Sequence, residues 1–181
     1  MKNLLILTSF SEKDKHARIL YEAAILKETY DSVDIFYAKD HKTGKNKFKE
    51  LLLFKYLDAE ILTELKAKQK DYDTFFLYGL RALLTLLFLP KSIRQKCVYQ
   101  TNNDDVSYIL YELKKRFFPF ILLGPFISPW LRAIEKRLSR TCKATLVNSK
   151  ALQAYLKHAI LSLYTSPMEG NPIDPTTKKP L

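Results

Sequence analysis

The sequence predicts an α/β fold, with a mainly parallel sheet that carries helices on both faces. Short apolar segments of strand length alternate with segments of helical periodicity along almost the whole chain. The first unit is complete: the apolar run of residues 2–8 is followed by a loop, a helix and a second strand that ends near residue 38. Strands that are separated by helices pair in parallel, which predicts a doubly wound sheet. Only four glycines occur, which argues against a sandwich or barrel with many tight turns.

The later elements follow from the same periodicities. Apolar residues at spacings of three and four predict helices, and short apolar runs that end at turn residues predict strands. Gly79 is expected to make the turn after the third strand, Pro90 to stop a short apolar helix, and Ser149 to cap the last helix. The predicted strands after the first unit are residues 73–79, 97–101, 143–149 and 161–166. The predicted helices are residues 48–70, 81–89, a helix from residue 106, and residues 150–158.

Length and composition set outer bounds on the class of protein. The chain has 181 residues, of which 47% are hydrophobic and 13% aromatic, so it is long and apolar enough for one core and is not a disordered chain. No apolar run reaches the roughly 20 residues of a spanning helix, and the first run is too short for a signal-peptide core. The net charge of +11 predicts an anionic partner, which is nucleic acid, an acidic membrane or a phosphorylated substrate.

The cysteines and histidines predict neither a disulfide framework nor a metal site. Cys97 and Cys142 adjoin apolar segments and are too few for a disulfide-stabilised secreted domain, so we expect buried, reduced thiols in a cytosolic protein. His16, His41 and His158 lack metal-ligand spacing. We therefore expect no metal and no cofactor, and we expect His41 and His158 to be exposed.

The first loop and helix carry a motif. The loop after residue 8 has no glycine, although a dinucleotide site would need glycines there. Residues 14–26 read D-x-x-x-R-x-L-x-E-A-x-x-L, with Asp14, Arg18 and the Glu22-Ala23 pair. This pattern, with the order of the elements, resembles the N-terminal domain of family 4 (group 1) glycosyltransferases with the GT-B fold. The resemblance implies a Rossmann-like domain over residues 1–166, and a Pro-rich linker over residues 167–181 toward a second, donor-binding domain.

The resemblance also implies an activity. Such enzymes transfer a sugar from a nucleotide-sugar donor to an acceptor with retention of configuration and without a metal ion. This domain would hold a lipid-linked or polysaccharide acceptor of cell-envelope biosynthesis, and a donor-binding domain, in cis or as a separate chain, would hold the nucleotide-sugar. We thus expect a cytoplasmic hexosyltransferase domain, peripheral at the inner face of the membrane and inactive or nearly so alone. The alternative is a non-catalytic membrane-recruiting subunit that docks a partner chain.

Open α/β sheets bind ligands outside the C-terminal ends of their strands, and this rule selects the candidate site. Arg18 is open to two interpretations: it pairs a phosphate bidentately, or it is a solvated residue paired with Glu22 one turn on. After the fourth strand, many members of the family have a His-Asp pair, but this chain has asparagines, so the catalytic residues are unknown. A turn capped by Asp105 or Ser107 is the structural alternative there. The candidate residues of the acceptor and phosphate side of the cleft are Ser9, Phe10, Ser11, Arg18, Thr101, Asn102, Asn103, Asp104 and Ser149.

Residues 112–140 form the most unusual stretch, in which aromatic and aliphatic residues lie between two basic clusters. Pro119, Pro125 and Pro129 predict that it is not one continuous helix, and a helix is expected only from about residue 128. Aromatic rings flanked by cations suit the surface of an anionic membrane; the alternative is a connection whose aromatic residues pack into the core. Nucleic acid is the weaker partner, since no nucleic-acid module fits the motifs. The residues assigned to membrane docking are Lys114, Lys115, Arg116, Phe117, Phe118, Phe120, Trp130, Arg132, Lys136 and Arg137.

Overall fold

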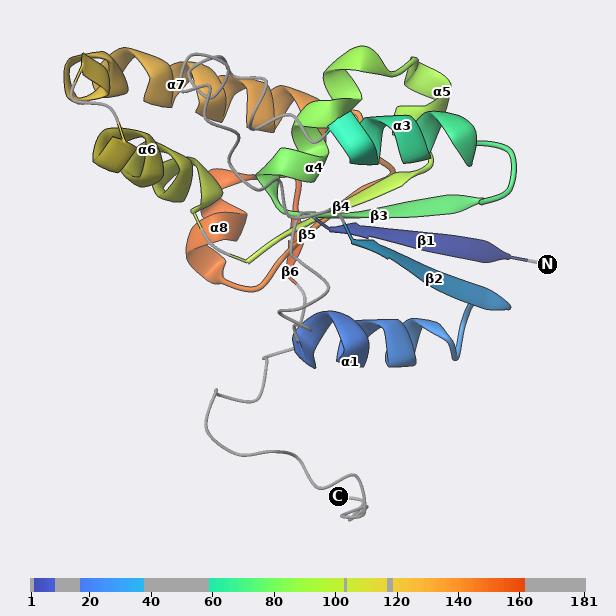
Figure 1. Cartoon of the computed structure of the whole chain (residues 1–181). Helices are drawn as coiled ribbons and strands as arrows, with labels where there is room; N and C mark the ends of the chain where they lie inside the picture. Colours follow the sequence, from blue (N-terminus) through green and yellow to red (C-terminus); the bar gives the residue numbers. More distant parts are fainter. Residues whose placement is uncertain (1, 9–16, 38–58, 103, 117–118, 162–181) are drawn as a thin grey trace, which may run out of the picture.

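A six-stranded, fully parallel sheet organises the protein, as seen in a computed structural model that describes residues 2–8, 17–37, 59–102, 104–116 and 119–161 (Figure 1). The strand order is β2-β1-β3-β4-β5-β6, and each neighbouring pair is parallel. The predicted α/β fold is therefore confirmed. The strands are β1 (Asn3–Thr8), β2 (Ser32–Tyr37), β3 (Thr74–Tyr78), β4 (Cys97–Thr101), β5 (Ala144–Val147) and β6 (Ile160–Leu161). The helices are α1 (Ala17–Leu26), α3 (Ala59–Ala67), α4 (Leu80–Leu84), the 3-10 helix η3 (Thr85–Phe88), α5 (Lys91–Arg94), α6 (Asp105–Arg116), α7 (Pro119–Ser139) and α8 (Lys150–Tyr155).

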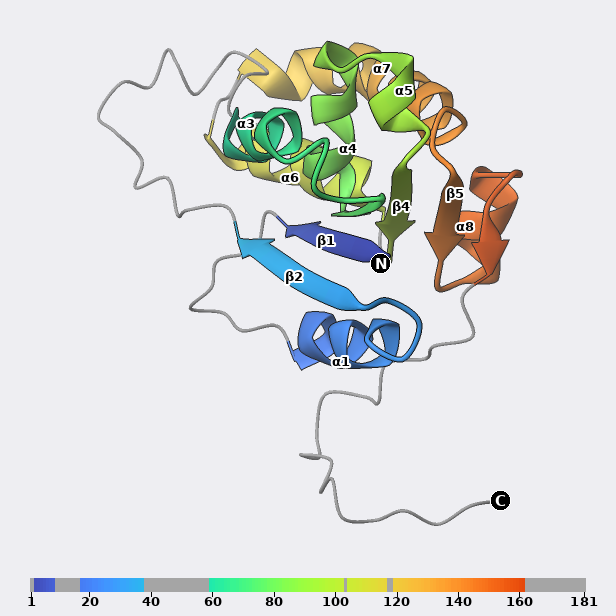
Figure 2. The ribbon, with the colours of Figure 1, turned by 90° about the vertical axis from the view of Figure 1, so that its right-hand side faces the viewer.

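The central strands are apolar because both of their faces are covered. Every residue of β3 is buried, as are Leu4 to Thr8 of β1, which is the pattern of a parallel strand between two layers. Alternate side chains point to opposite faces, so Leu5 and Leu77 join one apolar cluster and Ile6 and Phe76 the other. Helices α3, α4, α5, α6 and α7 cover the first face, and α1 lies on the second (Figures 1 and 2).

The predicted element boundaries hold well wherever a turn residue ends a run. β4 occupies the predicted residues, and β3 lies within its predicted range. The chain continues past Pro90 into α5, which was not predicted. Helix α3 lies within the helix predicted over residues 48–70. Residues 48–58 of that predicted helix lie outside the described part. The rest of the predicted sixth strand and the predicted linker, residues 162–181, lie outside it too.

The prediction that residues 112–140 are not one continuous helix is confirmed, because α6 ends at Arg116 and α7 begins at Pro119. The prediction that a helix starts only from about residue 128 is wrong, because α7 runs through Pro125 and Pro129. Pro119 occupies its first position, where the missing N–H has no helical acceptor to lose. Pro125 and Pro129 each remove one backbone hydrogen bond, and these losses lie one turn apart on the same side. Burial of apolar side chains compensates for these lost hydrogen bonds. Leu131 and Leu138 are 2% and 3% exposed in the larger apolar cluster, and tertiary packing rather than local propensity stabilises most protein helices.

Candidate functional site

The C-terminal ends of the parallel strands lie at one edge of the sheet. At this edge a glycine makes the turn between β3 and α4. Gly79, directly after β3, has φ 84° and ψ 166°, a conformation open almost only to glycine. A Cβ at this position would meet Asp105 Oδ2 at 3.4 Å, an ordinary contact. The backbone conformation, and not a lack of space, therefore requires the glycine, as predicted.

Four polar side chains form what we call the edge cluster: Glu22, Tyr78, Gln100 and Asn102. Gln100 is only 3% exposed, and its Nε2 donates to Glu22 Oε1 at 2.8 Å and to Asn102 Oδ1 at 3.4 Å. Asn102 Nδ2 donates to Tyr78 Oη at 2.5 Å. The cluster joins α1, β3 and β4 at the C-terminal edge, and it brings a carboxylate, two amides and a phenol together. Such groups both donate and accept hydrogen bonds, as recognition of hydroxyl-bearing ligands requires.

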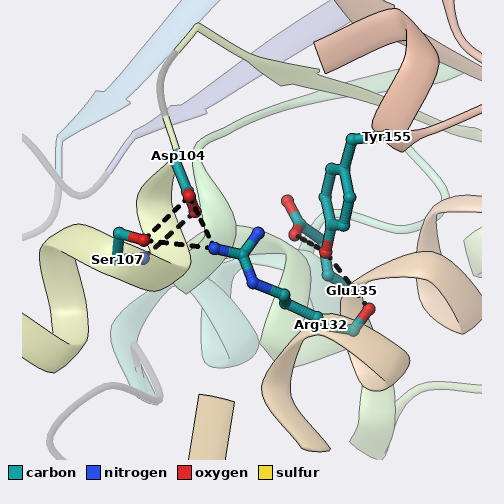
Figure 3. Close-up of polar contacts among 5 residues, drawn as sticks. All are labelled: Asp104, Ser107, Arg132, Glu135 and Tyr155. Carbon is teal, nitrogen blue, oxygen red and sulfur yellow. Dashed lines mark hydrogen bonds and ion pairs between the residues drawn. The ribbon is translucent and has the colours of Figure 1, made fainter. Parts of the chain in front are cut away.

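A second group ties the start of α6 to α7 (Figure 3). Arg132 Nη2 lies 2.6 Å from Asp104 Oδ2 and donates to Ser107 Oγ at 3.1 Å. Asp104 also caps α6, because its Oδ1 accepts from the Ser107 N–H at 3.1 Å. Partial burial raises the pKa of Asp104, but the hydrogen bonds from Arg132 and Ser107 outweigh it, so the pKa lies below its usual value.

The prediction that Asp105 or Ser107 caps this helix is wrong, because Asp105 turns inward. Its Oδ2 accepts from the Leu80 N–H at 2.9 Å and from Thr101 Oγ1 at 3.3 Å. It thereby holds the first residue of α4 against the end of β4. Burial raises the pKa of Asp105 above its usual value despite these hydrogen bonds.

Helix α7 also carries a buried carboxylate, Glu135, which binds two tyrosines. We call Glu135, Tyr99 and Tyr155 the tyrosine clasp. Glu135 is 3% exposed, and its Oε1 accepts from Tyr99 Oη at 2.8 Å. Its Oε2 accepts from Tyr155 Oη at 2.9 Å (Figure 3). Burial raises the pKa of Glu135 although both hydrogen bonds favour the charged form. The guanidinium of Arg132 lies 5.2 Å and the ammonium of Lys136 lies 4.5 Å from the centre of the Tyr155 ring. The clasp therefore fixes the ring on which both cations rest.

The structure brings three of the predicted cleft residues to one place. Thr101, Asn102 and Asp104 follow one another at the end of β4, and each makes the contacts given above. Ser149 caps α8, as predicted, by accepting from the Leu152 N–H at 3.3 Å. Ser9, Phe10, Ser11 and Asn103 lie outside the described residues, as does the side chain of Arg18.

Several residues of this edge were not among the predicted cleft residues. Gln100 and Tyr99 lie within an apolar strand, and their only signal is polarity inside that run. Glu135 is the single acidic residue of α7, whose other charged residues are basic, and this marks it as unusual. No local signal singles out Tyr155, because its role depends on where α8 packs.

The residues assigned to membrane docking divide into three sets. Trp130 is 50% exposed, and Arg137 is exposed as well. Arg132 and Lys136 are half-buried and lie against Tyr155. Phe117 and Phe118 lie outside the described residues, and so do the side chains of Lys114, Lys115, Arg116 and Phe120.

The cysteines carry unreactive thiols. Both are free; Cys97 is buried and Cys142 is half-buried, in agreement with the prediction of reduced thiols. Burial raises the pKa of Cys97 above its usual value and that of Cys142 to about 12, so neither is a thiolate at neutral pH. His158 is exposed, as expected, and His16 and His41 lie outside the described part.

The edge offers hydrogen-bonding groups and an ion pair. Within the described ranges, no three His, Cys, Asp or Glu side chains are grouped so that they could hold a metal ion. None of the helices seen there combines the length and apolar character that crossing a membrane requires. No protein-family model, curated protein or solved structure matches this chain.

Proposed function

We propose that this chain is the acceptor-binding, N-terminal domain of a retaining glycosyltransferase that uses a nucleotide-sugar donor and a membrane-associated lipid-linked or polysaccharide acceptor. The observation that carries the proposal is the edge cluster. Its carboxylate, amide and phenol groups converge at the C-terminal edge of a parallel sheet, where α/β domains bind ligands. A saccharide presents many hydroxyl groups, each of which donates and accepts, and this mixture of partners suits it.

The proposal divides the reaction between two domains. Transfer of a sugar leaves a nucleoside diphosphate whose developing charge needs cations and helix N-termini. At this edge Arg132 is already paired with Asp104 at 2.6 Å, so it supports the position of α6. The donor-binding groups would lie in a second domain, in cis or on a partner chain. The 181-residue chain is therefore expected to bind the acceptor without turning over a nucleotide-sugar.

A non-catalytic membrane-recruiting subunit is the second candidate, and one observation favours it. The members of the edge cluster already bond to one another, Gln100 to Glu22 at 2.8 Å and Asn102 to Tyr78 at 2.5 Å, as in a purely structural network. In that case the domain would dock a partner chain on the bilayer and would bind no saccharide.

Binding of acceptors in solution separates the two candidates. The ¹⁵N-labelled full chain is titrated with water-soluble oligosaccharides and with short-chain lipid-linked saccharides, and amide shifts are followed by NMR. The first proposal expects shifts centred on Gln100 and Asn102, and weaker binding in Asn102→Ala but not in Lys66→Gln, an exposed change on α3. Absence of shifts with every acceptor would favour the recruiting subunit. Turnover of a nucleotide-sugar by the chain alone would contradict the division of labour.

A further inference from the structure

We infer that the outward stripe of α7 docks this domain on an anionic lipid bilayer. Along the described part of α7, one side of the helix faces the core through Ile127, Leu131, Ile134 and Leu138. The opposite side is exposed at intervals of three and four residues, so it forms one continuous line along the helix. We call this line the α7 stripe: Phe126, Pro129, Trp130, Ala133, Arg137 and Arg140.

The N-terminal half of the stripe is apolar and strongly exposed. Phe126 is 75% exposed and Trp130 is 50% exposed. Helix α6 packs beside α7, and the hydrogen bond from Arg132 to Ser107 joins the two helices (Figures 1 and 3). Two residues of α6 add exposed rings, Tyr108 at 64% and Tyr111 at 55%. Four exposed aromatic side chains on one helix pair are far more than scattered surface residues require.

The C-terminal half of the stripe is cationic. Arg137 and Arg140 are exposed, and neither has an ion-pair partner among the described residues. The surrounding sequence reinforces the charge: residues 126–161 hold seven Lys and Arg and one carboxylate. That carboxylate, Glu135, is buried in the tyrosine clasp, so it does not neutralise the surface. Residues 126–161 therefore carry a formal charge of +6 out of the +11 of the whole chain.

This arrangement fits a bilayer better than the other anionic or apolar partners. A bilayer presents anionic headgroups at its surface and an apolar layer directly beneath them, so it binds both rings and cations from one face of a helix. A nucleic-acid strand favours rings and cations that alternate along its path, whereas here they occupy separate halves. A second copy would set one positive surface against another, which electrostatic repulsion opposes.

Docking through the stripe would also set the height of the candidate site. The stripe and the Asp104–Arg132 ion pair belong to the same helix pair, and Asp104 begins α6 at the end of β4. Docking would then fix the distance between the edge cluster and the lipid surface to which a lipid-linked acceptor is anchored. This last consequence rests on the proposed function; the docking itself does not, and it is tested without any saccharide.

The single tryptophan of the chain, Trp130, is a probe inside the stripe. The full chain is mixed with vesicles of pure phosphatidylcholine, or with about 30 mol% phosphatidylglycerol added, at roughly 0.1 M salt. We expect co-sedimentation with the anionic vesicles and a blue shift of the tryptophan emission, because the ring enters the headgroup region. Raising the salt to roughly 0.5 M is expected to weaken binding, since it screens the cations.

Two double variants separate the two halves of the stripe. Phe126→Ser with Trp130→Ser is expected to weaken vesicle binding at least about tenfold. Arg137→Gln with Arg140→Gln is expected to weaken it about 30-fold. Matched controls lie elsewhere: Leu20→Ser with Tyr21→Ser, 44% and 50% exposed on α1, and Lys66→Gln with Lys70→Gln near α3. Both controls should bind as the unchanged chain does, and circular dichroism checks that each variant is folded.

Three results would overturn the inference. The first is vesicle binding without a shift of the tryptophan emission, which would place the contact elsewhere. The second is binding to a DNA fragment or to polyphosphate as tight as to anionic vesicles and unaffected by the change at Phe126 and Trp130. The third is a dimer in sedimentation that the same change dissociates, which would assign the stripe to a second copy. A failure of acceptor binding in solution would count against the proposed function and would leave the docking unaffected.

Discussion

Replacing Glu135 tests the tyrosine clasp most directly. In Glu135→Ala, Tyr99, which is fully buried, loses the acceptor of its hydroxyl at 2.8 Å. An unsatisfied buried hydroxyl costs about 1–3 kcal/mol. The truncated side chain also loses buried methylene packing, at about 0.8 kcal/mol per methylene. Tyr155 is only half-buried, and its hydroxyl keeps the carbonyl of Arg132 at 3.3 Å as an acceptor. The stability lost at Tyr155 is therefore small. Together these losses amount to about 2–4 kcal/mol in the free energy of unfolding.

Glu135→Gln is the matched variant, since it keeps the volume and both hydrogen-bonding positions. Burial raises the folded-state pKa of Glu135 above its ordinary value of 4.5, so the folded protein holds this proton more tightly than the unfolded chain does. The stabilisation from the protonated form is therefore complete below pH 4.5 and is lost as the pH rises through the higher folded pKa. The amide of the variant carries no such charge, so the variant should gain stability relative to the unchanged chain as the pH rises over that window.

Urea denaturation followed by circular dichroism, from about pH 4.5 to 8, measures both effects. We expect a midpoint well below that of the unchanged chain for Glu135→Ala, because about 2–4 kcal/mol is a large share of the roughly 5–15 kcal/mol typical of a domain. Glu135→Gln should stay within about 1 kcal/mol of the unchanged chain at neutral pH. An alanine variant within about 1 kcal/mol of the unchanged chain would refute the clasp as a stabilising contact. A glutamine variant with the unchanged pH dependence would refute the raised pKa.

Of three further predictions, two concern the C-terminal edge of the sheet and one concerns the cysteines. Gly79→Ala should lower stability by about 1–3 kcal/mol in thermal unfolding, because alanine is strained at φ 84°; an unchanged midpoint would contradict this turn geometry. Asp104→Ala should cost about 1 kcal/mol in urea denaturation through loss of the α6 cap, and Asp104→Asn, which still caps, should cost less. The lowered pKa of Asp104 means that its contribution is present above pH 3.8 and is lost as the pH falls through the folded value. Cys97 and Cys142 should react with a thiol reagent at about pH 8 only after unfolding, because burial raises both pKa values; rapid reaction of both in the native chain would contradict their burial.

The fold was predictable because its signals are local. A run such as CVYQT, residues 97–101, is apolar and short because β4 is covered on both faces, and a turn or polar residue ends it. The same local rules failed inside α7, where Pro125 and Pro129 predicted breaks that the packing of Leu131 and Leu138 overrode. They also assigned the cap of α6 to Asp105 or Ser107 and not to Asp104, since Asp and Ser are both good caps. The Leu80 N–H, 2.9 Å from Asp105, decided that choice from another part of the chain.

From its residues alone, this chain showed its α/β class, most strand positions and its basic net charge. Periodicity and composition report whether each residue is buried, and burial follows the chain locally. Only the tertiary structure showed which side chains meet. Gln100 reaches Glu22 across 78 positions of sequence, and Tyr99 shares Glu135 with Tyr155. Such meetings depend on the strand order β2-β1-β3-β4-β5-β6 and on where each helix packs, and no pattern of neighbouring residues encodes either of these.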